Sequence, residues 1–217
     1  MTFPTATKDT TYDIPDHNTL TKIATLPITR EDGTHIPFSS LYTNPDQNPG
    51  TKHLIIFIRH FYCGSCQSYV ETLNHNASTF QKHNIVITII GNGHPTGIAP
   101  YRAKTATSFP ICTDPKRELY AALGMTVTLS AGEKQPEYIP GSMLANALKS
   151  TWNAVTSPAV WGGKAGNFAQ NGGELLFVRG DLKWCHRMLN TRDHAESGEL
   201  MEVCDVQALD AGMADGK

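Results

Sequence analysis

Apolar and polar residues alternate with two different periods along the chain, and each change of period marks the start of a new secondary-structure element. Residues 54–58 (Leu-Ile-Ile-Phe-Ile) form a continuous apolar run, which is typical of a β-strand buried on both faces. From Cys63 to Phe80, apolar residues recur at spacings of three and four, which predicts an amphipathic helix. Residues 84–90 repeat the pattern of a buried strand. The central part of the chain is therefore predicted to run strand, helix, strand.

Weaker patterns on both sides add further elements to this unit. Apolar stretches at 23–28 and 35–41 flank Asp32-Gly33, which is a signal for a β-hairpin. Strands and helices that alternate, followed by a hairpin and a helix, indicate an α/β protein with a central mixed sheet flanked by helices. The remaining predicted elements are helices at 98–107, 116–123, 142–155 and 197–206, a strand at 109–112, a loop at 157–173, and a second hairpin formed by 174–179 and 182–188.

Chain length and local composition together predict one domain with a loose segment at each end. A chain of 217 residues fills one core well and is short for two full domains. Residues 1–22, rich in Thr, Asp and Asn, are interpreted as a flexible N-terminal arm, and residues 208–217 as a flexible tail. The single domain is expected over residues 23–207, with the first hairpin as an N-terminal extension.

Composition and charge exclude several classes of function. Hydrophobic residues make up 40% and charged residues 18%, as expected for a folded globular protein. A formal net charge of -2 without any basic run argues against binding to nucleic acid or to anionic membrane surfaces. No apolar run is long enough to cross a bilayer, and the N-terminus lacks an apolar export signal, so we expect a cytoplasmic protein. In that reducing compartment, five cysteines indicate thiols or a redox pair rather than structural disulfides.

The chemistry is expected at Cys63 and Cys66, which come just after the first buried strand, at the start of the amphipathic helix. Unpaired backbone N–H groups and the positive end of the helix dipole stabilise a thiolate there. The second cysteine, three residues on, faces the same side and can resolve a mixed disulfide or a sulfenic acid. Arg59 and His60 precede the turn and are expected to add positive potential, Arg59 more so because its charge is permanent.

Two other interpretations of the cysteine pair are weaker. A zinc site would need a second close pair of ligands, and Cys112, Cys185 and Cys204 do not form one. An inert buried pair is disfavoured because function concentrates at strand-to-helix turns of α/β sheets. The other three cysteines are interpreted as packed thiols, and His186 and His194 as part of a structural group near the last helix. We therefore expect no metal and no cofactor.

Residues 59–66 (Arg-His-Phe-Tyr-Cys-Gly-Ser-Cys) resemble the R-x-F-x-C-x-x-C segment of the peroxiredoxin-like proteins grouped with the AhpC/TSA antioxidant enzymes. The resemblance covers about residues 50–205 and continues through 86–91, 113–120 (Thr-Asp-Pro-Lys-Arg-Glu-Leu-Tyr) and 170–175 (Gln-Asn-Gly-Gly-Glu-Leu). It implies a thioredoxin-like fold and a thiol-dependent antioxidant or redox-transfer activity.

The chain also departs from the P-x-x-x-T-x-x-C signature of typical peroxiredoxins. Counted back from Cys63, Ile56 and His60 stand at the Pro and Thr positions, and counted back from Cys66 the two positions do not match either. Residues 171–173 (Asn-Gly-Gly) stand where peroxiredoxins carry an Arg before the next strand and thioredoxins a Pro. The thioredoxin analogy makes Cys63 the nucleophile, whereas alignment of the helix makes it Cys66. We favour Cys63, because it lies nearer to the helix terminus and to solvent.

The leading hypothesis from the sequence is a peroxiredoxin-like oxidoreductase that reduces peroxides or disulfides through Cys63 and Cys66. Its partners would be the small-molecule substrate and a thiol electron donor such as thioredoxin or glutathione, and assembly as a homodimer is left open. Two alternatives remain. The same scaffold acts on one organic substrate in a biosynthetic pathway, or a redox-inactive binding protein retains the fold.

Overall fold

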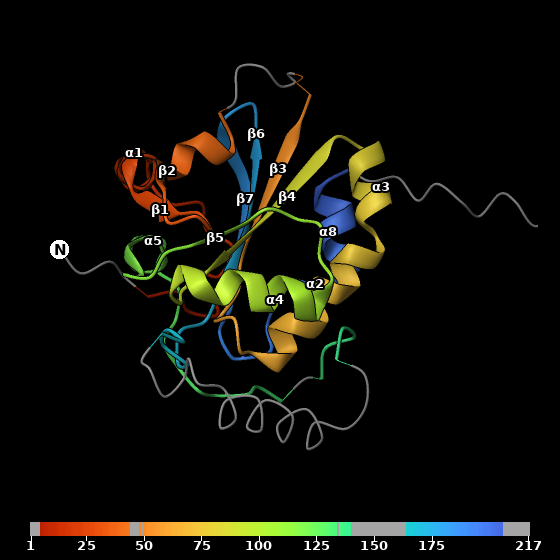
Figure 1. Ribbon diagram of the computed structural model, residues 1–217. Coiled ribbons are helices and arrows are strands. Elements are labelled where there is room, and N and C mark those ends of the chain that lie inside the picture. The colour runs from red at the N-terminus through yellow and green to blue at the C-terminus, as the bar shows by residue number, and fades with distance from the viewer. Residues whose placement is uncertain (1–4, 44–47, 49, 134, 140–163, 206–217) are drawn as a thin grey trace, which may run out of the picture.

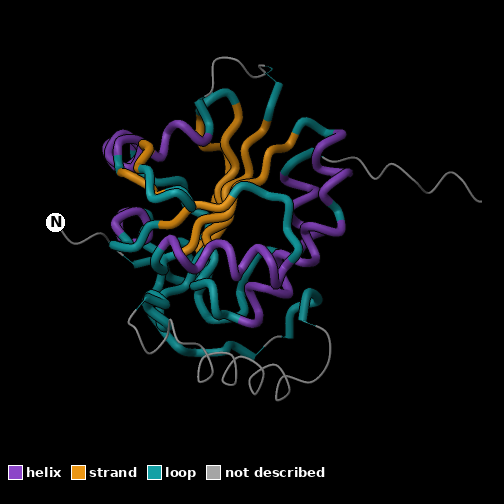
Figure 2. Tube along the Cα trace, viewed as in Figure 1, coloured by secondary structure: helices purple, strands orange, loops and turns teal. Residues whose placement is uncertain are grey.

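The computed structural model describes residues 5–43, 48, 50–133, 135–139 and 164–205. These residues form a seven-stranded mixed sheet with helices on both faces (Figures 1 and 2). The strands are β1 (Pro27–Thr29), β2 (His35–Pro37), β3 (Lys52–Phe57), β4 (Ile85–Gly91), β5 (Ile111–Thr113), β6 (Gly173–Val178) and β7 (Asp181–Arg187). The helices are α1 (His17–Thr25), α2 (Gly64–His75), α3 (Ala77–Lys82), α4 (Ile98–Thr105), α5 (Glu118–Ala122) and α8 (Ser197–Val203), with the 3-10 helices η1 (Phe38–Leu41) and η2 (Pro95–Gly97).

The strand order β2-β1-β5-β4-β3-β6-β7 puts the long apolar strands near the centre of the sheet. β3 lies parallel to β4 and β4 parallel to β5, whereas β6 runs antiparallel to β3 and β7 antiparallel to β6. β1 pairs with β2 across the Asp32-Gly33 turn, where Gly33 has a φ of 85°, and joins the sheet opposite β5. The structure thus confirms the predicted mixed sheet and both predicted hairpins.

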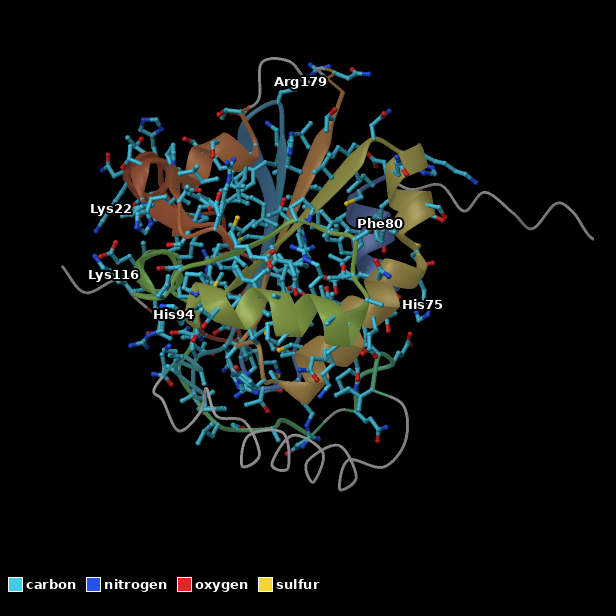
Figure 3. The ribbon with its side chains drawn as sticks, in the orientation of Figure 1. Lys22, His75, Phe80, His94, Lys116 and Arg179 are labelled. Carbon is cyan, nitrogen blue, oxygen red and sulfur yellow. The ribbon has the colours of Figure 1, made fainter. Side chains whose placement is uncertain are left out.

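The alternation of side chains along β3 divides the core into two layers. Leu54 and Ile56 pack against α2, α3, α4 and α8, whereas Ile55 and Phe57 pack against α1, η1 and α5 on the other face. All four side chains are at most 1% exposed, which accounts for the continuous apolar run in the sequence. Side chains fill the space between the sheet and the helices (Figure 3).

The helix expected from Cys63 to Phe80 is in fact two helices, α2 and α3, which meet at Asn76. Asn76 has φ -96° and ψ 9°, and its side-chain amide donates a hydrogen bond to the Thr72 carbonyl at 3.2 Å. Asn favours such local bonds over helix continuation, which accounts for the break. The apolar spacing continues across it because Phe80 of α3 packs in the same layer as Leu73 of α2.

The N-terminal segment differs from the loose arm expected over residues 1–22. α1 begins where Asp16 accepts the backbone N–H of Thr19 at 2.7 Å, and Ile23 of this helix is buried. Before α1, backbone carbonyls of the segment accept hydrogen bonds from the side chain of Arg187 on β7. The expectation that the first strand begins at Ile23 is wrong, because the Asp16 cap and the buried face of the segment favour a helix there.

The helices expected at 98–107, 116–123 and 197–206 are confirmed as α4, α5 and α8. The helix expected at 142–155 and the tail at 208–217 lie outside the described residues, as does part of the 157–173 loop. The extent of the domain, residues 23–207, stays a prediction. In the part of the chain that the structure describes, none of the helices has the length and apolar character needed to cross a membrane.

Candidate active site

The turn between β3 and α2 carries the two cysteines, as the sequence predicts. Cys63 is the N-cap of α2, with an extended backbone (φ -75°, ψ 111°). Its Sγ accepts the backbone N–H of Cys66 at 3.4 Å, in the position that a Ser or Asp oxygen takes at ordinary helix starts. A sulfur held there meets the unpaired N–H groups of the first helical turn, which favours its thiolate.

The two sulfur atoms are in direct contact. The Cys66 thiol donates to Cys63 Sγ at 2.8 Å, and both cysteines are buried and free. The Ser65 hydroxyl lies 3.1 Å from Cys63 Sγ and 3.3 Å from the Thr191 carbonyl oxygen. Tyr62, Gly64 and Ser65 are half-buried, so solvent reaches the turn on both sides of Cys63 in the sequence.

Arg59 is the charged group beside Cys63. Its Nη1 lies 3.5 Å from Cys63 Sγ, its Nε donates to Asn171 Oδ1 at 3.1 Å, and its Nη2 donates to the Phe168 carbonyl. Asn171 is fully buried and is held in turn by the Thr126 hydroxyl at 2.8 Å. The guanidinium is therefore fixed from the loop before β6, a support that sequence reasoning missed. The only signal for it was the unusual Asn-Gly-Gly at 171–173.

His60 differs from the expectation that it adds positive potential. Its ring is buried against the ring of Phe168, with centroids 4.3 Å apart and planes at 67°. Its Nδ1 has no hydrogen-bond partner within the described structure. Burial lowers the pKa of His60 to about 4; the neighbouring Cys63 opposes this shift, and the Arg59 charge adds a smaller effect in the same direction as burial. The ring is therefore neutral at neutral pH, and among the side chains Arg59 contributes more of the positive potential at Cys63 than His60 does.

The pKa values of the two thiols are shifted in opposite directions. Burial raises the pKa of Cys63, but the hydrogen bond from Cys66 and the charge of Arg59 outweigh it and hold that pKa well below its usual value. Burial and the neighbouring Cys63 together raise the pKa of the Cys66 thiol well above its usual value. The negative charge of the pair thus resides on Cys63. Such a pair contains a ready nucleophile and a protonated thiol in contact with it.

The other three cysteines have surroundings of a different kind. Burial raises the pKa of Cys112 to about 11 and that of Cys204 to about 11, and it also raises the pKa of Cys185. Thiols of this kind are protonated at neutral pH and are poor nucleophiles. No group of three or more His, Cys, Asp or Glu side chains arranged to hold a metal ion occurs within the described residues.

A second buried charged group lies on the same face of the sheet, farther along α2. Glu174 on β6 is fully buried, and its carboxylate oxygens lie 2.8 Å from His186 Nδ1 and 2.6 Å from His194 Nδ1. The His194 ring stacks on the ring of Tyr69 in α2 at 4.2 Å. Burial raises the pKa of Glu174, but the two imidazoles outweigh it and lower that pKa to about 2. The sequence placed both histidines in a structural group but did not identify Glu174 as their partner.

Residues 72–190 match the AhpC/TSA antioxidant enzyme family. The chain is also similar to Peroxiredoxin-like 2C of Homo sapiens, with 32% identity over 188 residues, and of Mus musculus, with 30% identity over 191 residues. These alignments cover 85% and 86% of this chain and 80% of each relative. The family match begins after Cys66, so the cysteine pair itself lies ahead of it.

Two solved structures share the fold. The bacterioferritin comigratory protein of Xanthomonas campestris superposes with a TM-score of 0.53 at 14% identity, covering 85% of this chain and 91% of that one. Peroxiredoxin 6 of Arenicola marina superposes with a TM-score of 0.54 at 12% identity, covering 83% of this chain and 69% of that one. These similarities confirm the predicted thioredoxin-like fold.

Proposed function

This chain belongs to the peroxiredoxin-like AhpC/TSA antioxidant enzyme family, and we propose that it is a thiol–disulfide oxidoreductase acting through Cys63 and Cys66. Cys63 is the nucleophile and Cys66 the resolving thiol. Arg59 stabilises the Cys63 thiolate, and His60 packs beside the turn as a neutral ring. The observation that carries the proposal is the opposite shift of the two thiol pKa values within one contact of 2.8 Å.

With a peroxide, the proposed reaction has two steps. The Cys63 thiolate attacks one peroxide oxygen, the O–O bond breaks, and the leaving oxygen takes a proton to depart as an alcohol or water. Cys63 is then a sulfenic acid. Cys66 attacks the Cys63 sulfur, the S–O bond breaks, and the hydroxyl leaves as water with the proton of the Cys66 thiol. The two thiols have lost two electrons and the peroxide has gained them.

With a disulfide substrate, the same pair acts by exchange. The Cys63 thiolate attacks one sulfur of the substrate, forms a mixed disulfide and releases a thiolate, which takes a proton. Cys66 then displaces the second substrate thiol and closes the Cys63–Cys66 bond. In either case an external thiol donor, such as thioredoxin or glutathione, returns the pair to the dithiol. The proposal places this cycle in the cytoplasm, where such donors are maintained, and requires no homodimer contact.

The experiment that tests the proposal is thiol mapping after mild oxidation. The reduced protein is treated with one equivalent of hydrogen peroxide or of an oxidised small-molecule disulfide, then unfolded in denaturant with N-ethylmaleimide and digested with trypsin. Cleavage after Arg59 and Lys82 leaves both cysteines in the single peptide 60–82. We expect this peptide to lose two hydrogens and take up no label, while Cys112, Cys185 and Cys204 are fully labelled.

The matched control is Cys112→Ser, which removes a buried thiol outside the pair and should leave the result unchanged. Full labelling of peptide 60–82 after both oxidants would mean a redox-inactive protein that retains the fold, and a main bond to any other cysteine would refute the assignment. If the bond forms but neither peroxide nor disulfide is turned over, the alternative of a specific organic substrate is favoured. The absence of the Pro and Thr signature at Ile56 and His60 is the feature that keeps this alternative open.

A further inference from the structure

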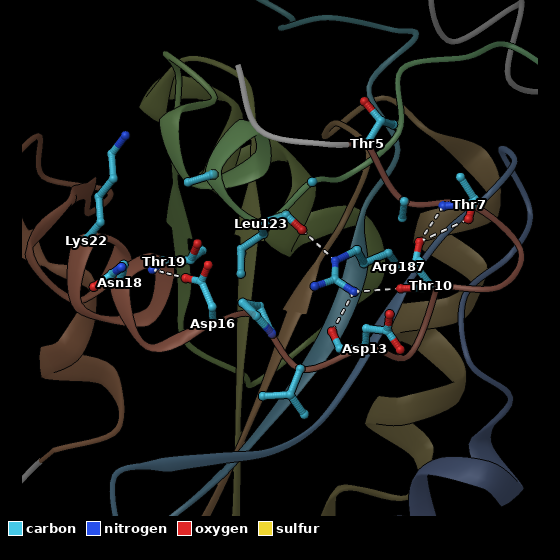
Figure 4. Close-up of a pocket in the computed structure, with 15 residues that line it drawn as sticks. Thr5, Thr7, Thr10, Asp13, Asp16, Asn18, Thr19, Lys22, Leu123 and Arg187 are labelled. Atoms are coloured by element: carbon cyan, nitrogen blue, oxygen red, sulfur yellow. Dashed lines mark hydrogen bonds between the residues drawn. The ribbon is translucent and has the colours of Figure 1, made fainter. Parts of the chain in front are cut away.

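A large cavity lies on the face of the sheet opposite the cysteines. It has a volume of about 680 Å³ and lies between the N-terminal segment and the end of α5 (Figure 4). Its walls combine apolar residues, among them Ile14, Pro15 and Leu123, with hydroxyl groups of several threonines. The volume is in the range of sites for small organic molecules, and the mixed apolar and polar lining suits a molecule that has both kinds of surface.

Arg187 lies in the wall of this cavity. It neighbours His186 on β7, and successive side chains of a strand point to opposite faces, so Arg187 lies away from α2 and from Cys63. The side chain is 7% exposed. Its Nε donates to the Leu123 carbonyl, and its Nη1 donates to the carbonyls of Thr10, Thr11 and Asp13 at 3.1, 3.4 and 2.9 Å.

The remaining nitrogen of this guanidinium, Nη2, has no carbonyl or carboxylate partner among the described residues, and the Cys185 thiol is a further side-chain neighbour of Arg187. Figure 4 shows Nη2 directed into the open space of the cavity, on the side away from Thr10. No described carboxylate lies within ion-pair distance of Arg187, although a guanidinium is always charged. A cation buried to this degree is ordinarily paired with an anion. Neutral groups, the backbone carbonyls and the Cys185 thiol, provide part of this compensation and leave the cation without an anion among the described residues.

We propose that this cavity binds an amphipathic small molecule through a single anionic head group, a carboxylate or a sulfonate. The head accepts hydrogen bonds from Arg187 Nη2, and the apolar body lies against Ile14, Pro15 and Leu123. Charge-assisted hydrogen bonds to a guanidinium are among the strongest in proteins. Arg187 therefore determines where the head group lies and requires its charge to be negative.

The other charged residues of the cavity restrict the ligand further. Asp13 and Asp16 are in the lining, as is Lys22. Asp16 already accepts the backbone N–H of Thr19 and caps α1, and Figure 4 shows Lys22 directed away from Arg187. A second negative charge on the ligand would meet the two aspartates, which is why the head carries only one. The site shares no residue with the cysteine pair, so its occupancy is independent of the proposed redox activity.

The test uses two fluorescent probes that differ in charge. 1-Anilinonaphthalene-8-sulfonate carries one sulfonate, and N-phenyl-1-naphthylamine has the same rings without it. We expect the folded wild-type protein to bind one sulfonate probe per chain, and to bind the uncharged probe at least about tenfold more weakly, as loss of one charge-assisted bond implies. Arg187→Gln should remove this preference and leave the two probes with similar dissociation constants.

A second variant keeps the test decisive if Arg187→Gln does not fold. Ala6 is half-buried in the cavity lining, and Ala6→Trp places an indole ring in part of the space without altering the partners of Arg187. It should weaken binding of both probes, while Ala6→Ser retains it. Equal binding of the two probes to the wild type, no binding of the sulfonate probe, or its undiminished binding to Ala6→Trp would each overturn the proposal. Labelling of Cys63 should be the same in every variant, because Cys63 lies on the opposite face.

Discussion

Two buried acidic groups lie on the same face of the sheet, and nitrogen-bearing partners of different kinds stabilise them. Cys63, which is 3% exposed, has the guanidinium of Arg59 at 3.5 Å from its sulfur. Glu174, which is fully buried, lies between the imidazoles of His186 and His194. The sulfur borders the half-buried start of α2, whereas the carboxylate is enclosed between β6, β7 and the segment that carries His194.

The two regions differ in whether the partner of the acidic group keeps its charge as pH changes. A guanidinium keeps its charge at every physiological pH. Arg59 therefore stabilises the Cys63 thiolate at every pH above the pKa of that thiol. The imidazole of His186 loses its charge as pH rises, so the carboxylate cluster depends on pH. The arrangement at Cys63 suits a reactive group. The arrangement at Glu174 suits a structural group, whose carboxylate oxygens are held in hydrogen bonds. We therefore expect substitutions in the first region to affect chemistry and those in the second to affect stability.

The largest expected effect is on turnover. Cys63→Ser should abolish thiol-dependent turnover of peroxide or disulfide, because a serine hydroxyl is not ionised at neutral pH and cannot replace the thiolate. Its unfolding free energy should stay within about 0.5 kcal/mol of the wild type, since Ser is a favourable N-cap residue for α2. Cys66→Ser should instead accumulate a sulfenic acid or a mixed disulfide on Cys63, detected by intact-mass spectrometry. Trapping in the Cys63→Ser variant and inactivity in Cys66→Ser would reverse the two roles.

The next effect in size is on stability. Glu174→Gln should lower the unfolding free energy by about 3 kcal/mol, because removing one partner of a buried ionic group leaves the others uncompensated. Chemical denaturation at pH 6 measures this, and turnover per folded molecule should be unchanged. Glu202→Gln, on the exposed side of α8, is the matched control and should alter stability little. Equal losses of stability in the two variants would contradict a structural role for Glu174.

The same cluster predicts how stability depends on pH. The pKa of Glu174 in the folded protein, about 2, is below its ordinary value of 4.5, so its stabilising contribution is present above pH 4.5 and is lost as pH falls toward 2. Although burial lowers the pKa of His186, its bond to Glu174 outweighs this and raises it above 6.5, so that contribution is lost as pH rises past the raised value. Denaturation midpoints between pH 2 and pH 9 should show both losses in the wild type and in Cys63→Ser. The acid loss should be smaller in Glu174→Gln.

The smallest expected effect is on the acidity of the reactive thiol. Arg59→Met should raise the pKa of Cys63 by about one unit, equivalent to about 1.4 kcal/mol, because a close positive charge is removed. His60→Phe should shift that pKa less than Arg59→Met does, because the His60 ring, with a pKa of about 4, is neutral at neutral pH. The pH dependence of iodoacetamide alkylation measures both, on peptide 60–82 in the wild type and His60→Phe, and on peptide 53–82 in Arg59→Met, which lacks the cleavage site after residue 59. If the midpoint moves upward in His60→Phe and not in Arg59→Met, the assignment of the positive potential to Arg59 is wrong.

Several secondary-structure elements of this protein are encoded in local sequence patterns, and these elements were predicted from the sequence. The buried strands β3 and β4 follow from uninterrupted apolar runs, and α2 follows from spacings of three and four that begin at Cys63. The position of Cys63 and Cys66 at a helix start follows from the same change of period. The N-terminal helix α1 and the break at Asn76 were missed, because each depends on one polar side chain that bonds the local backbone.

Tertiary structure alone decided the electrostatics of the site. Arg59 and His60 are adjacent in the sequence, yet one contacts Cys63 and the other is buried as a neutral ring, a difference made by Asn171 and Phe168 from a loop more than a hundred residues away. The sequence by itself determined which elements form and that two cysteines open one helix, because those features depend on neighbouring residues. It could not determine which thiol carries the charge, since burial and distant partners set a pKa and leave no periodic signal along the chain.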